Sequence, residues 1–233
     1  MIFGRKKASG PVVDEVEVDE TDVLEDDLDL EDDDEVTDEW STLDRMDWRE
    51  DGPFDITEVD LDADDVVRLD LGTIIVTPFE GMQVQLQVDE ASREVRAMLV
   101  LHEGSGIEVA LFAAPKATSM LAEVRADMIA DTASGGGTVE VVKGPFGAEI
   151  RRRLPITGPE GEKLLHVSRT WFAQGPRWLL RGVVMGAAGE ETGTERATLA
   201  LYEFFANVVV RRGEAPLAAG DVIPMSLPEG AQQ

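Results

Sequence analysis

Hydrophobic residues recur with two different periods in this chain, and the period typical of strands begins after residue 64. Met82–Val88 is the clearest case, because four apolar residues alternate with three glutamines and therefore point to one side of a strand. Seven more apolar runs predict strands. They are Val66–Val76, Val95–Leu101, Ile107–Ala113, Thr138–Val142, Phe146–Leu154, Lys163–Phe172 and Arg177–Met185.

Two segments change to the helical period of three to four residues. The first runs from Ala117 to about Ala133 and ends before three consecutive glycines. The second follows Thr192-x-x-Glu195, which has the pattern of a capping box and predicts that a helix starts there. The order of elements predicts an α+β fold, in which an antiparallel sheet from two ββββα halves, 64–134 and 138–210, carries packed helices.

Lys163–Gly186 contains two of the four tryptophans, and we expect it to form the centre of the sheet. If the loop Ala173–Pro176 closes a hairpin, Trp171 lies directly beside Trp178. The two indoles then form an aromatic pair on the core face, where such a pair contributes roughly 0.2–1 kcal/mol to stability.

The same hairpin register gives two further expectations. Gly182 lies opposite Val167, where the missing side chain lets a bulky helix residue such as Phe204 approach closely. Arg169 points to the core together with the tryptophans, although arginine is rarely buried without a partner. The sequence therefore predicts either a buried acidic partner for Arg169 or a different register.

The other side of these strands gathers polar side chains. Phe146 and Ile150 have the spacing of core residues, so we expect Glu149, Arg151 and Arg153 to point outward. Guanidinium groups bind phosphates and carboxylates, so these residues could form a binding site. Alternatively, they are the ordinary polar residues of a solvent-exposed sheet face. The candidate face for an anion or a partner comprises Arg151, Arg153, His166, Ser168, Arg177 and Arg181.

Charge separates the chain into two parts. The net charge is −27, and residues 11–40 carry seventeen acidic residues and no basic one. Such a segment repels itself and buries too little apolar surface to fold. We therefore expect a disordered acidic tail over 1–51, a single α+β domain over 52–227 and a short second tail over 228–233.

A tryptophan-containing segment lies where the acidic tail meets the domain. Trp40, Leu43 and either Met46 or Asp47 have roughly helical spacing, and Trp48 is nearby. The motif Trp40, Leu43 and Trp48 could thus belong to a recognition helix for a partner protein. Exposed tryptophans are costly, however, which favours docking of this segment onto its own chain.

Known catalytic and metal-binding motifs are absent from the sequence. There is no phosphate-binding glycine loop, no nucleophile elbow and no H-E-x-x-H, and the chain has no cysteine. Asp60-x-Asp62-x-Asp64 begins like a calcium loop, but Asp65 stands where that loop needs glycine. We therefore expect no cofactor and no metal, and enzymatic activity is disfavoured. Without a signal peptide or an apolar run long enough for a bilayer, a cytoplasmic location is expected.

Three motifs carry a resemblance to a known family. They are G-P-F-D-I-T at Gly52–Thr57, L-G-T-I-I-V-T-P at Leu71–Pro78 and G-P-R-W-L-L-R-G at Gly175–Gly182. Together with the basic start and the acidic tail, they resemble an actinobacterial family, domain of unknown function family 3710. The resemblance implies a bacterial cytoplasmic setting and no particular activity.

Two functional hypotheses follow. The first is a non-enzymatic cytoplasmic binding or adaptor protein that engages a protein partner, with the acidic tail as a regulator or solubiliser. The alternative is an anion or nucleic-acid binder whose basic sheet face is masked by the acidic tail. The sequence leaves the identity of the partner and the oligomeric state open.

Overall fold

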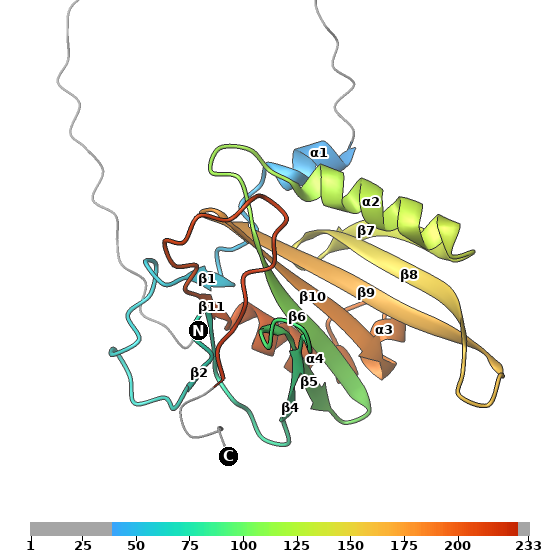
Figure 1. The fold of residues 1–233 in the computed structure, drawn as a ribbon, viewed down its shortest axis with the longest axis horizontal. Helices are drawn as coiled ribbons and strands as arrows, with labels where there is room; N and C mark the ends of the chain where they lie inside the picture. Colours follow the sequence, from blue (N-terminus) through green and yellow to red (C-terminus); the bar gives the residue numbers. More distant parts are fainter. Residues whose placement is uncertain (1–38, 228–233) are drawn as a thin grey trace, which may run out of the picture.

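A large antiparallel sheet with helices on both faces dominates the computed structural model, which describes residues 39–227 (Figure 1). The strands are β1 (Phe54–Asp55), β2 (Leu69–Asp70), β3 (Ile74–Val76), β4 (Gln83–Val88), β5 (Val95–His102), β6 (Ser105–Ala113), β7 (Thr138–Gly144), β8 (Gly147–Thr157), β9 (Lys163–Gly175), β10 (Trp178–Gly186) and β11 (Val209–Val210). The helices are α1 (Glu39–Asp44), α2 (Leu121–Ser134), α3 (Ala187–Glu190) and α4 (Ala197–Ala206). This architecture confirms the predicted α+β class.

Seven strands form the large sheet in the order β4-β5-β6-β10-β9-β8-β7. The run Val66–Val76, which we expected to be one strand, is divided into β2 and β3 by a turn at Gly72, whose φ is 79°. These two short strands join β1 and β11 in a separate four-stranded sheet of order β1-β11-β3-β2.

The large sheet is covered on both faces, and alternate residues of β10 show this directly. Leu180 and Val184 belong to the main core, which also contains Phe205 of α4. Leu179 points the other way and packs with Ile150 and the apolar residues of α2. The helices that end the two predicted halves thus lie on opposite faces. The matching strands of the two halves run antiparallel, so a two-fold axis that exchanged the halves would be perpendicular to the sheet and would place both helices on one face. Because the helices lie on opposite faces, no such axis relates the two halves.

The β9–β10 hairpin is tighter than expected. Gly175 pairs with Trp178, which leaves only Pro176 and Arg177 in the loop, and Arg177 has a φ of 65°. Trp171 therefore lies opposite Gly182 and not beside Trp178, so the predicted register is wrong. The observed pairing differs from the predicted one by an even number of residues, however. Because side chains alternate between the two faces of a strand, the predicted faces of the two tryptophans are unchanged.

Gly182 allows the close approach that its position predicted, although the neighbouring ring is a different one. A Cβ at this position would lie 2.7 Å from Cε2 of Phe205 and 2.9 Å from Cδ1 of Ile107. The helix therefore packs with Phe205, and not Phe204, against the backbone of β10.

The predicted capping box does not start a helix. Helix α4 begins at Ala197, and its first backbone N–H groups, those of Ala197 and Thr198, donate to the carboxylate of Glu191 at 3.3 and 3.1 Å. An acidic group from the preceding loop thus takes the place that we assigned to Thr192 and Glu195. No helix within residues 39–227 is long and apolar enough to cross a membrane.

Candidate functional site

The register between β8 and β9 divides the predicted polar face. Arg151 pairs with Arg169, and Arg152 pairs with Ser168. Directly paired residues share a face, so Arg152 lies on the side of Ser168 while Arg151 and Arg153 lie on the other side. The prediction of one common face is therefore wrong. Because both faces of β8 are covered at Ala148 and Ile150, their burial does not reveal the orientation of the strand.

The six predicted residues consequently occupy three places. Arg151 and Arg153 lie on the side of α3, next to a cavity. His166, Ser168 and Arg181 lie on the side of α2. Arg177 lies in the β9–β10 loop, where its carbonyl oxygen accepts a hydrogen bond from the backbone N–H of Ala114.

On the α2 side, Arg152, Ser168, Thr170 and Arg181 form a polar patch that we call the arginine face. Ser168 and Thr170 are fully buried, and their hydroxyl groups have no hydrogen-bond partner within the described residues. The Nε atoms of Arg152 and Arg181 are buried and lack a partner as well. Four polar atoms with unused hydrogen-bonding capacity thus gather in one place on the sheet, which is a costly arrangement unless another group binds there.

The arginine face carries two positive charges, and Glu108 and Asp131 are the acidic residues that act on Arg152 there. Arg181 donates from Nη2 to Glu108 Oε1 at 3.3 Å and lies over the ring of Phe112. Arg152 forms no ion pair with any described residue. Burial and the positive charge of Arg181 lower the pKa of Arg152, and the negative charges of Asp131 and Glu108 offset this only in part. An anion close to Arg152 would favour its charged form and so counteract both effects.

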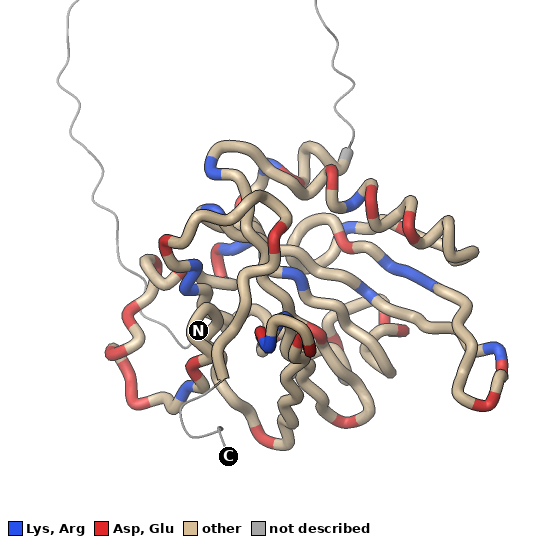
Figure 2. Tube along the Cα trace, in the orientation of Figure 1, with Lys and Arg blue, Asp and Glu red and all other residues tan. Residues whose placement is uncertain are grey.

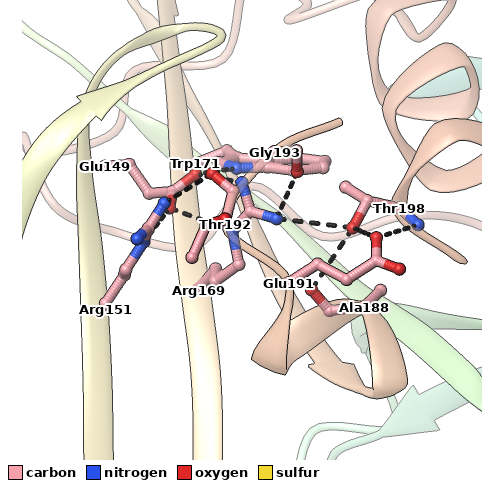
Figure 3. Close-up of polar contacts among 9 residues, drawn as sticks. All are labelled: Glu149, Arg151, Arg169, Trp171, Ala188, Glu191, Thr192, Gly193 and Thr198. Atoms are coloured by element: carbon pink, nitrogen blue, oxygen red, sulfur yellow. Dashed lines mark hydrogen bonds and ion pairs between the residues drawn. The ribbon is translucent and has the colours of Figure 1, made fainter. Parts of the chain in front are cut away.

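A different polar cluster is buried on the α3 side (Figure 3). Glu149 and Arg169 are both 1% exposed and form a two-point ion pair, with distances of 2.9 and 2.8 Å. Trp171 and Arg151 donate to the same carboxylate, each at 2.7 Å. The core-facing Arg169 therefore has the buried acidic partner that its position required, and Glu149 points inward, contrary to our expectation.

These contacts fix the loop before α4. Arg169 donates to the carbonyl oxygen of Gly193 at 2.7 Å, and Arg151 donates to that of Thr192 at 2.9 Å. Burial opposes the ionisation of Glu149 most strongly. The hydrogen bonds and charges of its donors nevertheless outweigh burial and hold the pKa of Glu149 below its ordinary value of 4.5. The buried polar atoms of Glu149, Arg169 and Trp171 all have partners here, so these three residues offer little to a ligand.

A cavity of about 600 Å³ lies beside this cluster, at the edge of β7 and β8. Its lining carries both signs of charge, from the three arginines of β8 and from Glu140, Glu190 and Glu191. In Figure 2 the three consecutive arginines of β8 form one continuous basic stretch. The acidic groups make this cavity less selective for an anion than the arginine face.

The segment around Trp40, Leu43 and Trp48 lies against the body. Leu43 is 9% exposed, and Asp44 forms a two-point ion pair with Arg125 of α2, at 3.1 and 2.8 Å. The indole of Trp48 donates to the carbonyl oxygen of Leu43 and lies beneath Lys143. This arrangement supports docking onto the same chain. The described structure thus begins within the predicted tail over 1–51. Residues 1–38 of that tail and the second predicted tail over 228–233 lie outside the described residues.

Sequence reasoning missed Arg152 and Thr170. Three consecutive arginines must place one side chain on the face opposite the other two, so the run Arg151–Arg153 always supplied an arginine to the α2 side. Thr170 lies two residues after Ser168 on the same strand and therefore on the same side, but it was not part of the candidate site. Within residues 39–227, no three histidine or acidic side chains are grouped so that they could hold a metal ion.

Comparison with known proteins identifies a family but no activity. No curated protein and no solved structure matches the chain. The model of a family described as a protein of unknown function, DUF3710, matches residues 52–233, which include both sheets and the arginine face. Since this match covers most of the chain and contains all three motifs that carried the resemblance, the protein belongs to the DUF3710 family.

Proposed function

We propose that this protein is a non-enzymatic binding protein whose arginine face takes an anionic group, either a phosphate or a carboxylate. The observation that carries the proposal is the set of four buried polar atoms without partners, on Arg152, Ser168, Thr170 and Arg181. The cytoplasmic location and the regulatory or solubilising role of the acidic residues 11–38 are further parts of this proposal, predicted from the sequence alone.

The chemistry of the arginine face favours an anion over a cation or a neutral group. Arginine side chains only donate hydrogen bonds, and the hydroxyl groups of Ser168 and Thr170 can also donate. An incoming group must therefore accept several bonds at once, as phosphate and carboxylate oxygens do. Glu108 already accepts from Arg181, which leaves Arg152 as the cation with the most to gain.

The arrangement is better suited to a single anionic group than to a nucleic-acid strand. Strand-binding surfaces combine a long basic groove with aromatic rings on which bases stack. Here Phe112 lies beneath Arg181, where the guanidinium covers one side of its ring. Nucleic acid therefore serves as a comparison ligand in the test and is not the proposed one.

Calorimetric titration with pyrophosphate tests the proposal. The full chain is used with the acidic residues between 11 and 38 changed to amides, so that they cannot compete for the site. Charge-assisted hydrogen bonds contribute about 1.5–3 kcal/mol each, so Arg152→Gln and Arg181→Gln should each weaken binding by about 10- to 100-fold. Citrate and a single-stranded oligonucleotide, titrated in parallel, separate phosphate, carboxylate and nucleic-acid binding.

Arg153→Gln is the matched control, because Arg153 lies on the same strand and points to the other face. It should leave the affinity for pyrophosphate unchanged. Equal losses from Arg152→Gln and Arg153→Gln would show attraction to the whole basic run and contradict the proposed site. The absence of binding to pyrophosphate and to citrate would contradict the function.

A second candidate function, an adaptor that engages a protein partner, is supported by the β8–β9 arm, residues 154–166. β7 pairs with β8 only as far as Arg153, so the arm extends beyond its neighbour (Figure 1). Ile156, Leu164 and Leu165 are 41%, 45% and 57% exposed there. Large apolar residues gathered on a projecting hairpin are typical of protein-binding surfaces.

Site-specific crosslinking in the source cells tests the adaptor function. A photoreactive residue at Leu165 should give one discrete adduct, whereas the same residue at Ile129 of α2, which is 39% exposed, should not. Indistinguishable patterns from both positions would contradict a specific role for the arm.

A further inference from the structure

Three strand edges of the large sheet are open, and they differ in how they resist pairing with another strand. An open edge exposes unpaired N–H and C=O groups, and folded proteins usually protect it with charges, proline or a covering segment. The open edges are β7 at one end of the sheet, the part of β8 in the arm, and β4 at the other end.

Two of the three edges are protected. β7 carries Glu140 and Lys143, both exposed, within seven residues. In the arm, Pro155 is paired with Leu165 of β9 and has no N–H to offer on the open side. Neither edge is therefore suited to accept a further strand.

β4 has none of these protections. Gln83–Val88 contains no charged residue and no proline, in a chain whose net charge is −27. The irregularity between β4 and β5 places the additional residue, Arg96, on β5, so β4 itself runs without interruption. All three glutamines of β4 are exposed.

The apolar layer beneath the sheet is also incomplete at β4. Val100 and Met98 of β5 are fully buried, but Val84 and Leu86, which pair with them on the same face, are only half-buried. Val88 at the end of the strand is 48% exposed. One further strand beside β4 would cover these side chains.

We propose that β4 pairs with β4 of a second copy of this chain, antiparallel and around a two-fold axis through Leu86. In this register Val84 faces Val88 of the other copy, and Gln85 faces Gln87. The exposed Val88 becomes covered. The side-chain amide of Gln87 donates to Glu108 of its own chain at 2.9 Å, so the amide of Gln85 can donate to the side-chain oxygen of Gln87 of the other copy. The two large sheets join into one continuous sheet.

The residues at the ends of β4 favour this register, and they favour a second copy of the chain as the partner of β4. Asp89 lies opposite Gln83 of the other copy, and Glu90 lies opposite Met82, so no acidic residues meet directly. A register centred on Gln85 would place Glu90 against Glu80, which costs free energy. Because the pattern Val-Gln-Leu-Gln-Val is symmetric about Leu86, the strand complements itself better than an arbitrary peptide does.

Sedimentation analysis of the full chain over a wide range of concentrations tests the pairing. One strand pair buries less than the roughly 1,200–2,000 Å² of a stable interface, so we expect a reversible monomer–dimer equilibrium. The variant Gln85→Lys with Gln87→Lys opposes like charges across the axis and should remain monomeric. Thr138→Lys with Glu140→Lys at the β7 edge should dimerise like the wild type. A wild type that stays monomeric throughout, or equal loss in both variants, would overturn the proposal.

Introduced cysteines test the register, because the natural chain contains none. Paired residues on antiparallel strands have Cα atoms about 4.5–5.5 Å apart, within reach of a disulfide, while diagonal neighbours lie about 7–8 Å apart. A mixture of Gln85→Cys and Gln87→Cys chains should therefore crosslink under oxidation far more than either variant alone. Equal yields from all three samples, or no crosslink, would refute a two-fold axis at Leu86.

Discussion

At the scale of single residues, Glu149 is the acidic group at the centre of the buried cluster on the α3 side. Its carboxylate accepts hydrogen bonds from Arg151, Arg169 and Trp171, and no part of Arg169 can reach water as a substitute. The sequence suggested this pair only indirectly. Alternation along the strand placed Arg169 on the same core face as the tryptophans, where an arginine needs an acidic partner. Nothing in the sequence identified which acid would meet it, because that depends on the register between β8 and β9.

Replacing Glu149 by glutamine should destabilise the protein by about 3–5 kcal/mol, because Arg169 is then left buried without a counter-charge. Chemical denaturation measures this difference in the free energy of unfolding. Glu140→Gln on the exposed edge strand is the control and should change stability by no more than about 0.5 kcal/mol. A similar small effect of Glu149→Gln would show that the buried pair contributes little.

The contribution of Glu149 should also depend on pH in a defined direction. Its pKa in the folded protein lies below the ordinary value of 4.5, so its ionised form favours folding above that pH. The contribution is then lost as the pH falls through the lowered pKa. The difference in unfolding free energy between wild type and Glu149→Gln should therefore shrink on acidification below 4.5. A difference that stayed constant or grew would contradict the lowered pKa.

At the scale of elements, most strands and the faces of β9 and β10 were predictable, whereas registers and the faces of β8 were not. Alternation along the strands placed Trp171 and Trp178 on the correct face although the loop length was wrong. A shift of the pairing by an even number of residues leaves every side chain on the same face. The length of the β9–β10 loop was not predictable, since Arg177 adopts a positive φ that is unusual for arginine. On β8, both faces are covered, so the buried positions no longer alternate and the orientation of Arg151–Arg153 was assigned incorrectly.

Gly182→Ala tests the packing of α4 on β10. The added methyl group would come within 3 Å of both Phe205 and Ile107, so the variant should lose about 1–3 kcal/mol of stability through overpacking. Gly193→Ala is the matched control, because its new Cβ would lie 3.9 Å from the nearest atom. Thermal or chemical unfolding compares the two variants. Equal midpoints would mean that the helix can move away from the strand without cost.

At the scale of the whole molecule, the α+β class followed from the order of apolar patterns, but the arrangement of layers did not. The run Val66–Val76 leaves the large sheet because Gly72 turns the chain, and α2 and α4 cover opposite faces. The registers of β8, β9 and β10 place Arg152 and Arg181 together on the α2 side, apart from Arg151 and Arg153. The sequence could place the candidate site on a face of the sheet. Which residues make up the site could be decided only from the observed register.

Binding of an anion at the arginine face is the central claim, and the side-chain Nε–H resonances of arginine test it most directly. In a ¹⁵N-labelled full chain with residues 11–38 carrying amides in place of acids, added pyrophosphate should shift the signals of Arg152 and Arg181 in a saturable manner. The signals of Arg151 and Arg153 on the opposite face should stay in place. Uniform shifts of all four signals, or shifts confined to Arg151 and Arg153, would contradict the account.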